Sequence, residues 1–302
     1  MTYIRNVAVI GVSGNVGRST VKALLQNGFK VTGVTRQTSD SAVPEGIDHI
    51  KSDYSEESLV IALKGQDAVV STVSSIVVGQ TLSLQKTIID AAIKAGVQVF
   101  VPSEYGIDTA DPAAPKYIPF LQDKVDILNY LKSQEDKISW VAIISGLMFD
   151  WGLHIPGFGG WDFKARTATI FDGGDIPFEA TNLDQVGRAV ALSLKSLGVT
   201  RNQYVYVNSF TATQNEVLKA LEKVTGRDWE VSEGTVDGLW EGGCDQVKGG
   251  NSLGALAQIA GAIYGKGGLA NYSVNKGLWN DRIHLPGEIL DEFVKEFVAS
   301  KQ

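Results

Sequence analysis

The stretch VAVIGVSGNVGRSTVKALL, residues 7–25, decides the fold. A strand-length apolar run ends at Gly11, and beyond Gly17 apolar residues recur at helical spacing. In such a unit the first glycine permits the sharp exit from the strand, Gly14 lets backbone amides approach a pyrophosphate, and the third lets the helix pack on the sheet. This spacing between a strand and a helix predicts dinucleotide binding. The turn residues expected at the cofactor are Gly11, Ser13, Gly14, Asn15, Val16 and Gly17.

Alternating strands and helices are predicted up to about residue 143. Apolar, often β-branched runs of strand length cover 5–11, 30–35, 46–51, 66–73, 97–103 and 138–144. Helical spacing of apolar residues covers 15–28, 55–65, 81–96 and 120–134. Strands that are apolar on both faces indicate a parallel sheet covered on both sides. The sequence therefore predicts an α/β fold, a Rossmann-type doubly wound parallel sheet.

The pattern becomes less regular after residue 144, where aromatic residues and glycines accumulate. We expect an NAD(P)-binding domain over 1–150 and a substrate-binding lobe over 151–302, with parts of the latter returning to the Rossmann sheet. The return is indicated by helical spacing over 182–198 and 213–226 and by a strand over 203–210. The glycine-rich segment 234–282 is expected to form a smaller lobe over the strand ends.

The composition excludes several classes of protein. With 27 basic and 34 acidic residues the net charge is −7, so nucleic acid and anionic membranes are not expected as partners. A single cysteine, Cys244, excludes an internal disulfide and fits a reducing compartment.

The histidines are His49, His154 and His284, and their scattered positions predict no metal site. With neither a cleavable leader nor a membrane-length apolar run, we expect a cytoplasmic protein.

Arg36 ends the second predicted strand, where the preference between the two nicotinamide cofactors is set. Sites that prefer NAD carry an acidic residue at this corner, whereas an arginine accommodates the 2′-phosphate of NADP. Its planar guanidinium binds phosphate through two parallel hydrogen bonds. Arg36 therefore predicts NADP(H) as the cofactor. The alternative is a solvated arginine in a polar turn, because residues 35–41 read TRQTSDS.

Further cofactor contacts are predicted where other strands end. Asp53 follows the third strand, and two interpretations stay open for it, an adenine contact or a helix cap. Ser74 and Ser75 follow the fourth strand, and the ends of such strands line the ligand crevice. We expect both serines near the cofactor.

The Tyr-x-x-x-Lys pair typical of hydride-transferring short-chain folds is missing from its usual place. Its only match, Tyr272 with Lys276, lies far downstream of the fifth and sixth strands and is interpreted as a chance occurrence. The chain instead carries VFVPSEYGID at 99–108, LQDKVDILNYLK at 121–132 and SGLMFDWGL at 145–153. With the glycine turn, these segments resemble the NmrA-like, isoflavone reductase-like branch of the atypical short-chain dehydrogenases, and PSEYG and FDWGL are similar to fungal members.

This resemblance, which covers residues 1 to about 155, implies an NADP-dependent oxidoreductase. It aligns the catalytic lysine of the reductases with Lys124 and places Pro102, Ser103, Glu104, Tyr105 and Gly106 in the loop beneath the nicotinamide. Relatives occur as dimers or monomers, which leaves a homodimer open. From the residue itself, a position near a helix start and partial burial would both lower the pKa of Lys124 and suit it to acid–base work. The alternative is a lysine on a solvated helix face.

Ring-bearing side chains gather just after the sixth strand. Interleaved glycines suit a loop that lines a pocket for an aromatic substrate better than the interior of a helix, although core packing is the alternative. Tyr105 from the preceding loop is expected to join this pocket. The ring-bearing residues are Phe149, Trp151, His154, Phe158, Trp161 and Phe163; His154 would also supply a polar handle.

These expectations combine into one function. We expect an NADPH-dependent reductase of an aromatic or phenolic small molecule, a ketone, enone or benzylic ether of secondary metabolism, with Lys124 as general acid or base. One alternative is an NADP-sensing regulator that binds a protein partner without catalysis. Another is a non-redox isomerase or dehydratase on the same fold.

Overall fold

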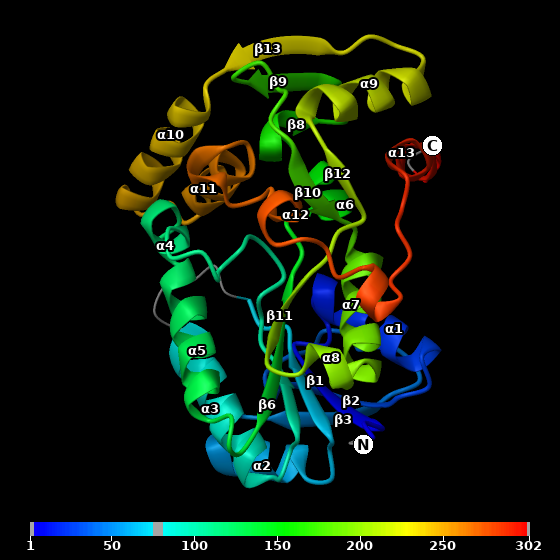
Figure 1. Cartoon of the computed structure of the whole chain (residues 1–302), viewed down its shortest axis with the longest axis vertical. Helices are drawn as coiled ribbons and strands as arrows, with labels where there is room; N and C mark the ends of the chain where they lie inside the picture. Colours follow the sequence, from blue (N-terminus) through cyan, green and yellow to red (C-terminus); the bar gives the residue numbers. More distant parts are fainter. Residues whose placement is uncertain (1–2, 75–80, 301–302) are drawn as a thin grey trace.

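A parallel seven-stranded sheet forms the lower half of the molecule (Figure 1). The computed structural model describes residues 3–74 and 81–300. Strand order is β11-β6-β5-β4-β1-β2-β3, so the direction of winding reverses between β1 and β4. This confirms the doubly wound fold. The strands are β1 (Asn6–Ile10), β2 (Lys30–Arg36), β3 (Asp48–Ser52), β4 (Ala68–Ser71), β5 (Val99–Val101), β6 (Ser139–Ile144) and β11 (Gln203–Tyr206).

Helices cover both faces of this sheet because its central strands are apolar on both sides. In β1, Val7 and Val9 pack toward one helical layer and Ala8 and Ile10 toward the other. The first layer contains α1 (Asn15–Gln26) and α7 (Leu183–Lys195). The second contains α2 (Glu56–Leu63), α3 (Thr81–Lys94) and α5 (Leu121–Ser133).

A second lobe lies beyond the carboxyl ends of the strands, in the upper half of Figure 1. It is built on two three-stranded sheets, ordered β12-β10-β7 and β13-β9-β8. Its strands are β7 (Leu147–Met148), β8 (Trp161–Asp162), β9 (Thr167–Phe171), β10 (Phe178–Thr181), β12 (Phe210–Ala212) and β13 (Glu230–Gly234). The remaining helices are α4 (Ala114–Tyr117), α6 (Phe149–Leu153), α8 (Leu197–Thr200), α9 (Gln214–Thr225), α10 (Val236–Lys248), α11 (Gly254–Ile263), α12 (Tyr272–Asn275) and α13 (Leu290–Ala299), with 3-10 turns at Phe158–Gly160, Lys266–Gly268 and Asp281–Ile283.

The chain crosses between the two lobes more than once. The strand expected over 203–210 is divided, because β11 joins the large sheet and β12 joins a small one. Helix α7 likewise returns to the large sheet after β10. The domain boundary near residue 150 stays a prediction. In the described parts of the chain, no helix is both long and apolar enough to cross a membrane.

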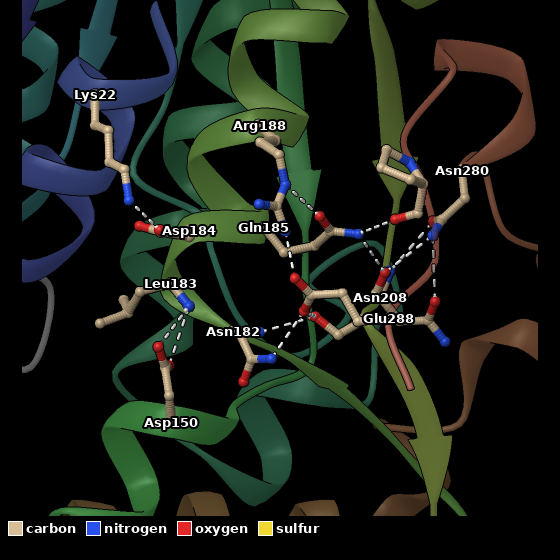
Figure 2. A network of polar contacts seen from close by, with 12 residues as sticks. Lys22, Asp150, Asn182, Leu183, Asp184, Gln185, Arg188, Asn208, Asn280 and Glu288 are labelled. Carbon is tan, nitrogen blue, oxygen red and sulfur yellow. Dashed lines mark hydrogen bonds and ion pairs between the residues drawn. The ribbon is translucent and has the colours of Figure 1, made fainter. Parts of the chain in front are cut away.

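Polar contacts attach the C-terminal segment to α7 (Figure 2). The Glu288 carboxylate accepts hydrogen bonds from Asn182 Nδ2 at 2.8 Å and Ser209 Oγ at 2.5 Å, and it forms an ion pair with Arg188. Gln185 Nε2 donates to a backbone carbonyl of the same segment. The segment before α13 is therefore held against a helix of the large sheet.

Helix α7 also lies in unusually close contact with α1. A Cβ atom added at Gly187 would stand 2.3 Å from the backbone carbonyl oxygen of Ser19. Lys22 of α1 forms an ion pair of 2.5 Å with Asp184 of α7. Only glycine permits this approach, so the two helices form one rigid layer.

We expect Gly187→Ala to lower the free energy of unfolding by about 1–3 kcal/mol, because the added methyl group forces the helix backbones apart. Chemical denaturation followed by circular dichroism measures this difference. Gly242→Ala is the matched control, since Gly242 also lies inside a helix, α10, but has open space around it. The control should be neutral or stabilise by up to about 1 kcal/mol. Equal effects of the two substitutions would contradict the close-contact explanation.

Candidate functional site

A cavity of about 630 Å³ lies at the carboxyl ends of the strands, at the reversal of winding between β1 and β4. Ligands of doubly wound sheets bind at this position, and the volume lies in the range of small-molecule sites. Its lining begins at Arg36 on β2, passes the glycine turn after β1 and the end of β4, and reaches Lys124 and the second lobe. The sheet order therefore places Arg36 and Lys124 at opposite ends.

The glycines of the turn have different structural roles. Gly11 has a φ of +87°, which suits glycine. A Cβ at Gly17 would lie 2.3 Å from the Gly11 carbonyl oxygen, so Gly17 permits helix packing and does not line the cavity. Gly14 lines the cavity and is the N-cap residue of α1, with no described side chain capping that helix. The other turn residues that line the cavity are Gly11, Ser13, Asn15 and Val16.

Arg36 is exposed at the end of β2, and its side chain makes no hydrogen bond or ion pair within the described chain. Ser39 and Ser41 line the same end of the cavity, and a turn that joins Ser39 N to the Arg36 carbonyl at 2.9 Å brings them there. Neither serine was predicted, although both stand in the polar run after the strand. This corner offers a guanidinium without a partner among residues 3–74 and 81–300 and two hydroxyl groups, a donor set that fits a phosphate.

Tyr54 is another residue of this corner that sequence reasoning missed. It lines the cavity with a φ of +64°, a backbone conformation that few tyrosines adopt. Burial raises the pKa of its hydroxyl to about 12, and the nearby charge of Arg36 opposes the shift. The neutral ring thus provides a flat wall beside Arg36.

Asp53 and the serines after β4 have separate positions. The Asp53 carboxylate accepts hydrogen bonds from Ser55 N at 2.9 Å and Ser55 Oγ at 2.7 Å, which lower its pKa. Ser55 in turn caps α2, so Asp53 supports the cap and is absent from the described cavity lining. Ser74 lines the cavity, whereas Ser75 lies outside the described residues.

The loop after β5 is held by buried polar contacts. Ser103 N donates to Gln85 Oε1 at 2.9 Å, and Ser103 Oγ donates to the Val73 carbonyl at 2.7 Å. Tyr105 has a φ of +42°, and its amide donates to the Ile143 carbonyl of β6 at 3.0 Å. Residues 103–107 line the cavity, whereas Pro102 does not. Gln85, on α3, was not identified from the sequence, because it is one of several polar residues in that helix.

Lys124 is buried near the start of α5, with only 7% of the residue exposed. Its Nζ donates a hydrogen bond to the backbone carbonyl of Glu104. Burial lowers the pKa of the Lys124 ammonium, and the Glu104 carboxylate partly opposes this effect. Burial also raises the pKa of Glu104, whose carboxylate accepts a hydrogen bond of 2.7 Å from Thr109. Lys124 is thus a buried amine in the cavity lining whose charged form is less favoured than in water.

The aromatic residues after β6 divide into two groups. Trp151 and Phe158 line the cavity and meet edge to face, with ring centroids 5.5 Å apart. The others do not line it. Phe149 and Trp161 are buried in the core of the second lobe, where Phe149 contacts Phe210 and Phe293, and the half-buried Phe163 packs against this core beside Trp229. His154 is exposed and contacts the ring of Phe297, so the polar handle predicted for it does not face the cavity.

Helix α11 supplies a cavity wall that the sequence did not identify. Leu256, Ile259 and Ile263 recur at helical spacing and line the cavity. The hairpin of α10 and α11 is held in place by Trp240 Nε1, which donates to the Tyr117 carbonyl at 2.7 Å. The apolar lining at this end is completed by Ile107, Phe120, Leu121, Leu147 and Met148. Lys124 and Glu104 therefore lie beside an apolar compartment.

Two further expectations concern residues away from the cavity. Neither Tyr272 nor Lys276 lines the cavity. Tyr272 is buried, and its hydroxyl donates a hydrogen bond to the Val207 carbonyl at 2.6 Å. Within residues 3–74 and 81–300, no cluster of three or more His, Cys, Asp or Glu side chains could hold a metal ion.

Comparison with known proteins decides the family. The model of the NmrA-like family matches residues 4–241. The chain belongs to the NmrA-like family. Oxidoreductase aprR of Aspergillus flavus is 40% identical over 230 residues, covering 74% of this chain and 75% of that protein. Isoflavone reductase homolog IRL of Zea mays is 32% identical over 246 residues, covering 73% and 74%.

A solved structure of AtPrR2 with NADP+ and (+)pinoresinol superimposes on this NmrA-like chain with a TM-score of 0.78. It shares 22% identity and covers 98% of this chain and 100% of its own, which supports a common fold. The resemblance predicted from the sequence is confirmed. The chain is an oxidoreductase of the NmrA-like, isoflavone reductase type.

We expect Gly14→Ala in this NmrA-like protein to weaken NADP+ binding about tenfold or more. The nearest neighbour of the added Cβ would be the Gly11 carbonyl oxygen at 3.3 Å, so the methyl group would enter the cavity rather than the protein core. Isothermal titration calorimetry measures the affinity, and a thermal melt without cofactor should stay close to that of the wild type. Unchanged NADP+ affinity would contradict the role given to this turn.

Proposed function

We propose that the protein is an NADPH-dependent reductase of a neutral aromatic or phenolic small molecule in secondary metabolism. The observation that carries the proposal is that one cavity joins the corner of Arg36 to a buried lysine with apolar walls. A ketone, an enone or a benzylic ether is the reactive group that this arrangement suits. The relative named isoflavone reductase homolog and the neighbour solved with pinoresinol support this class.

The described residues fit a reduced dinucleotide. Gly14 and the amides at the start of α1 would hold the pyrophosphate, and Arg36 with Ser39 and Ser41 would hold the 2′-phosphate. The loop around Ser103 would lie under the nicotinamide. When bound, the reduced nicotinamide supplies the hydride, and the protein supplies orientation and charge control.

Lys124 would manage the proton. When hydride adds to a carbonyl carbon, the π electron pair moves to the oxygen, and the Lys124 ammonium can donate a proton to that oxygen. When hydride adds to a benzylic ether carbon, the C–O bond breaks, and the same ammonium can protonate the departing oxygen. For a phenolic substrate the neutral amine can first remove the phenol proton. Both roles need an amine whose pKa is lowered from its ordinary value, and burial supplies that shift.

The apolar compartment favours an enzyme over the alternatives. The ionisable residues that line the described cavity are Arg36, Tyr54, Glu104, Tyr105 and Lys124, so Lys124 is its one cation apart from Arg36. A sensor that only binds the nucleotide has no need of apolar walls beyond the nicotinamide. The walls instead suit a neutral, flat molecule.

A substrate screen tests the proposal directly. Aromatic ketones, enones and benzylic ethers are incubated with the protein and NADPH, absorbance is followed at the reduced-nicotinamide band, and products are identified by mass spectrometry. Turnover of at least one neutral aromatic compound is expected. NADPH binding without turnover would instead favour the sensor, and conversion without NADPH consumption would favour an isomerase or dehydratase.

We expect Arg36→Ala to weaken NADPH binding about tenfold or more while leaving NADH binding nearly unchanged, because only NADPH carries the 2′-phosphate. Arg36→Lys should give an intermediate loss, since lysine keeps the charge but not the planar fork. Calorimetric titration with both nucleotides measures the ratio. Equal weakening of the two nucleotides would contradict the assignment.

We expect Lys124→Met to lower kcat by a factor of about 10² to 10⁴ while NADPH affinity stays within about twofold, because the amine acts mainly in the transition state. Lys132→Met, on the exposed side of the same helix, is the matched control and should change neither. If Lys124 is the acid, kcat of the wild type falls as pH rises through its lowered pKa, below the ordinary 10.5. A pH profile without this limb, or full activity in Lys124→Met, would remove Lys124 from the mechanism.

A further inference from the structure

Asp150 is a carboxylate that links α6 to the first turn of α7 (Figure 2). Its Oδ1 accepts hydrogen bonds from Trp151 N at 2.8 Å and from Leu183 N at 3.0 Å. Its Oδ2 lies 3.1 Å from the same Leu183 N. One side chain therefore binds the backbone of both helices.

The first backbone amide of helix α7 donates its hydrogen bond to this carboxylate. Asn182 is the N-cap residue of α7, but its side chain makes no capping bond and donates instead to Glu288. The acceptor for the backbone N–H of Leu183, the first helical residue, is the side chain of Asp150. A carboxylate at a helix N-terminus is favourable in both hydrogen bonding and charge. Removal of Asp150 would leave this amide without its partner.

The other end of the link is a cavity wall. Trp151 follows Asp150 directly and lines the cavity, where it meets Phe158 edge to face. Leu147 and Met148, just before α6, line the same wall. Helix α6 is only five residues long, too short to be stable through its own hydrogen bonds. Its orientation therefore depends on attachments to other elements.

Helix α7 is a rigid attachment point. It contacts α1 so closely at Gly187 that no side chain fits between them, and α1 is the helix that follows the glycine turn. A bond from α6 to α7 thus fixes the wall that carries Trp151 relative to the dinucleotide end of the cavity.

We propose that Asp150 is a positioning residue for substrate binding, which holds Trp151 against the aromatic ligand by accepting hydrogen bonds from Trp151 N and Leu183 N. The proposal rests on the proposed function in that the compartment beside Lys124 binds an aromatic molecule. A wall that is ordered before binding loses less entropy when the ligand arrives. Asp150 itself does not line the cavity and acts through Trp151.

A double-mutant cycle tests this. The variants are Asp150→Ala, Asp150→Asn, Trp151→Ala and the double variant Asp150→Ala/Trp151→Ala. Asp184→Asn is the matched control, because Asp184 is also an acid in the first turn of α7 but pairs with Lys22 on the side of α1. The readouts are the affinity for Prodan, a neutral fluorescent naphthyl ketone, in the presence of NADP+, the NADP+ affinity itself, and kcat and KM for any substrate from the screen.

We expect Asp150→Ala and Trp151→Ala each to weaken Prodan binding about tenfold, with the double variant no weaker than Trp151→Ala alone. Asp150→Asn keeps one acceptor oxygen and should lose less, which also tests the idea if the alanine variant does not fold. KM should rise while kcat and NADP+ affinity stay nearly constant. Asp184→Asn should change none of these values.

Two results would overturn the proposal: Prodan affinity unchanged in both Asp150 variants, or the same loss from Asp150→Ala with and without Trp151. The second would show that Asp150 affects the fold generally rather than this wall. Failure of the proposed function looks different, because NADPH consumption would be absent while the Prodan cycle still reports on the wall.

Discussion

The contact between the start of α1 and the end of β1 is the constraint on which the site depends. At Gly17 the helix comes so near the Gly11 carbonyl that no Cβ fits. This approach directs the uncapped helix N-terminus at the cavity and supports the rigid layer formed with α7. The glycine turn and the wall attached through α7 are therefore both positioned by their contacts with α1.

The opposite end of the cavity depends on burial. An amine in water keeps its proton over the whole physiological range, but Lys124 is surrounded by protein and faces an apolar compartment. Desolvation lowers its pKa while Glu104 limits how far the shift goes. The ammonium form of this residue is therefore less favoured than that of a lysine in water.

The sequence predicted the large sheet well because its signals are local. Alternating apolar runs and helical spacing identified β1 to β6 and the longer helices between them, although not the short α4, and most residues of the glycine turn line the cavity. Arg36 and Lys124 were both placed at the cavity. The aromatic segment was harder, since Phe149 and Trp151 look alike in sequence and only the packing of β12 and α13 decides which ring enters the core.

The residues that the sequence did not predict come either from long-range contacts or from turn geometry. Leu256 and Ile263 lie on a helix more than a hundred positions from Lys124. The sequence predicted a lobe of residues 234–282 over the strand ends, but nothing local indicated which of its side chains line the cavity. Ser39 and Tyr54 depend on turn geometry that a polar composition does not specify. Asp53 illustrates the same limit, because an acid after a strand can contact a ligand or, as here, brace a helix cap.

The repeated crossings of the chain between its two halves set the kind of motion that is available. Because β6 leads into β7, α7 follows β10, and β11 precedes β12, several connections join the halves in parallel. The two halves therefore cannot rotate about one linker as separate domains do. The α10–α11 hairpin is joined to its neighbours differently: it lines the apolar end of the cavity through α11 and contacts α4 through one indole hydrogen bond. Substitutions on α11 therefore change the apolar end of the cavity without touching the glycine turn after β1.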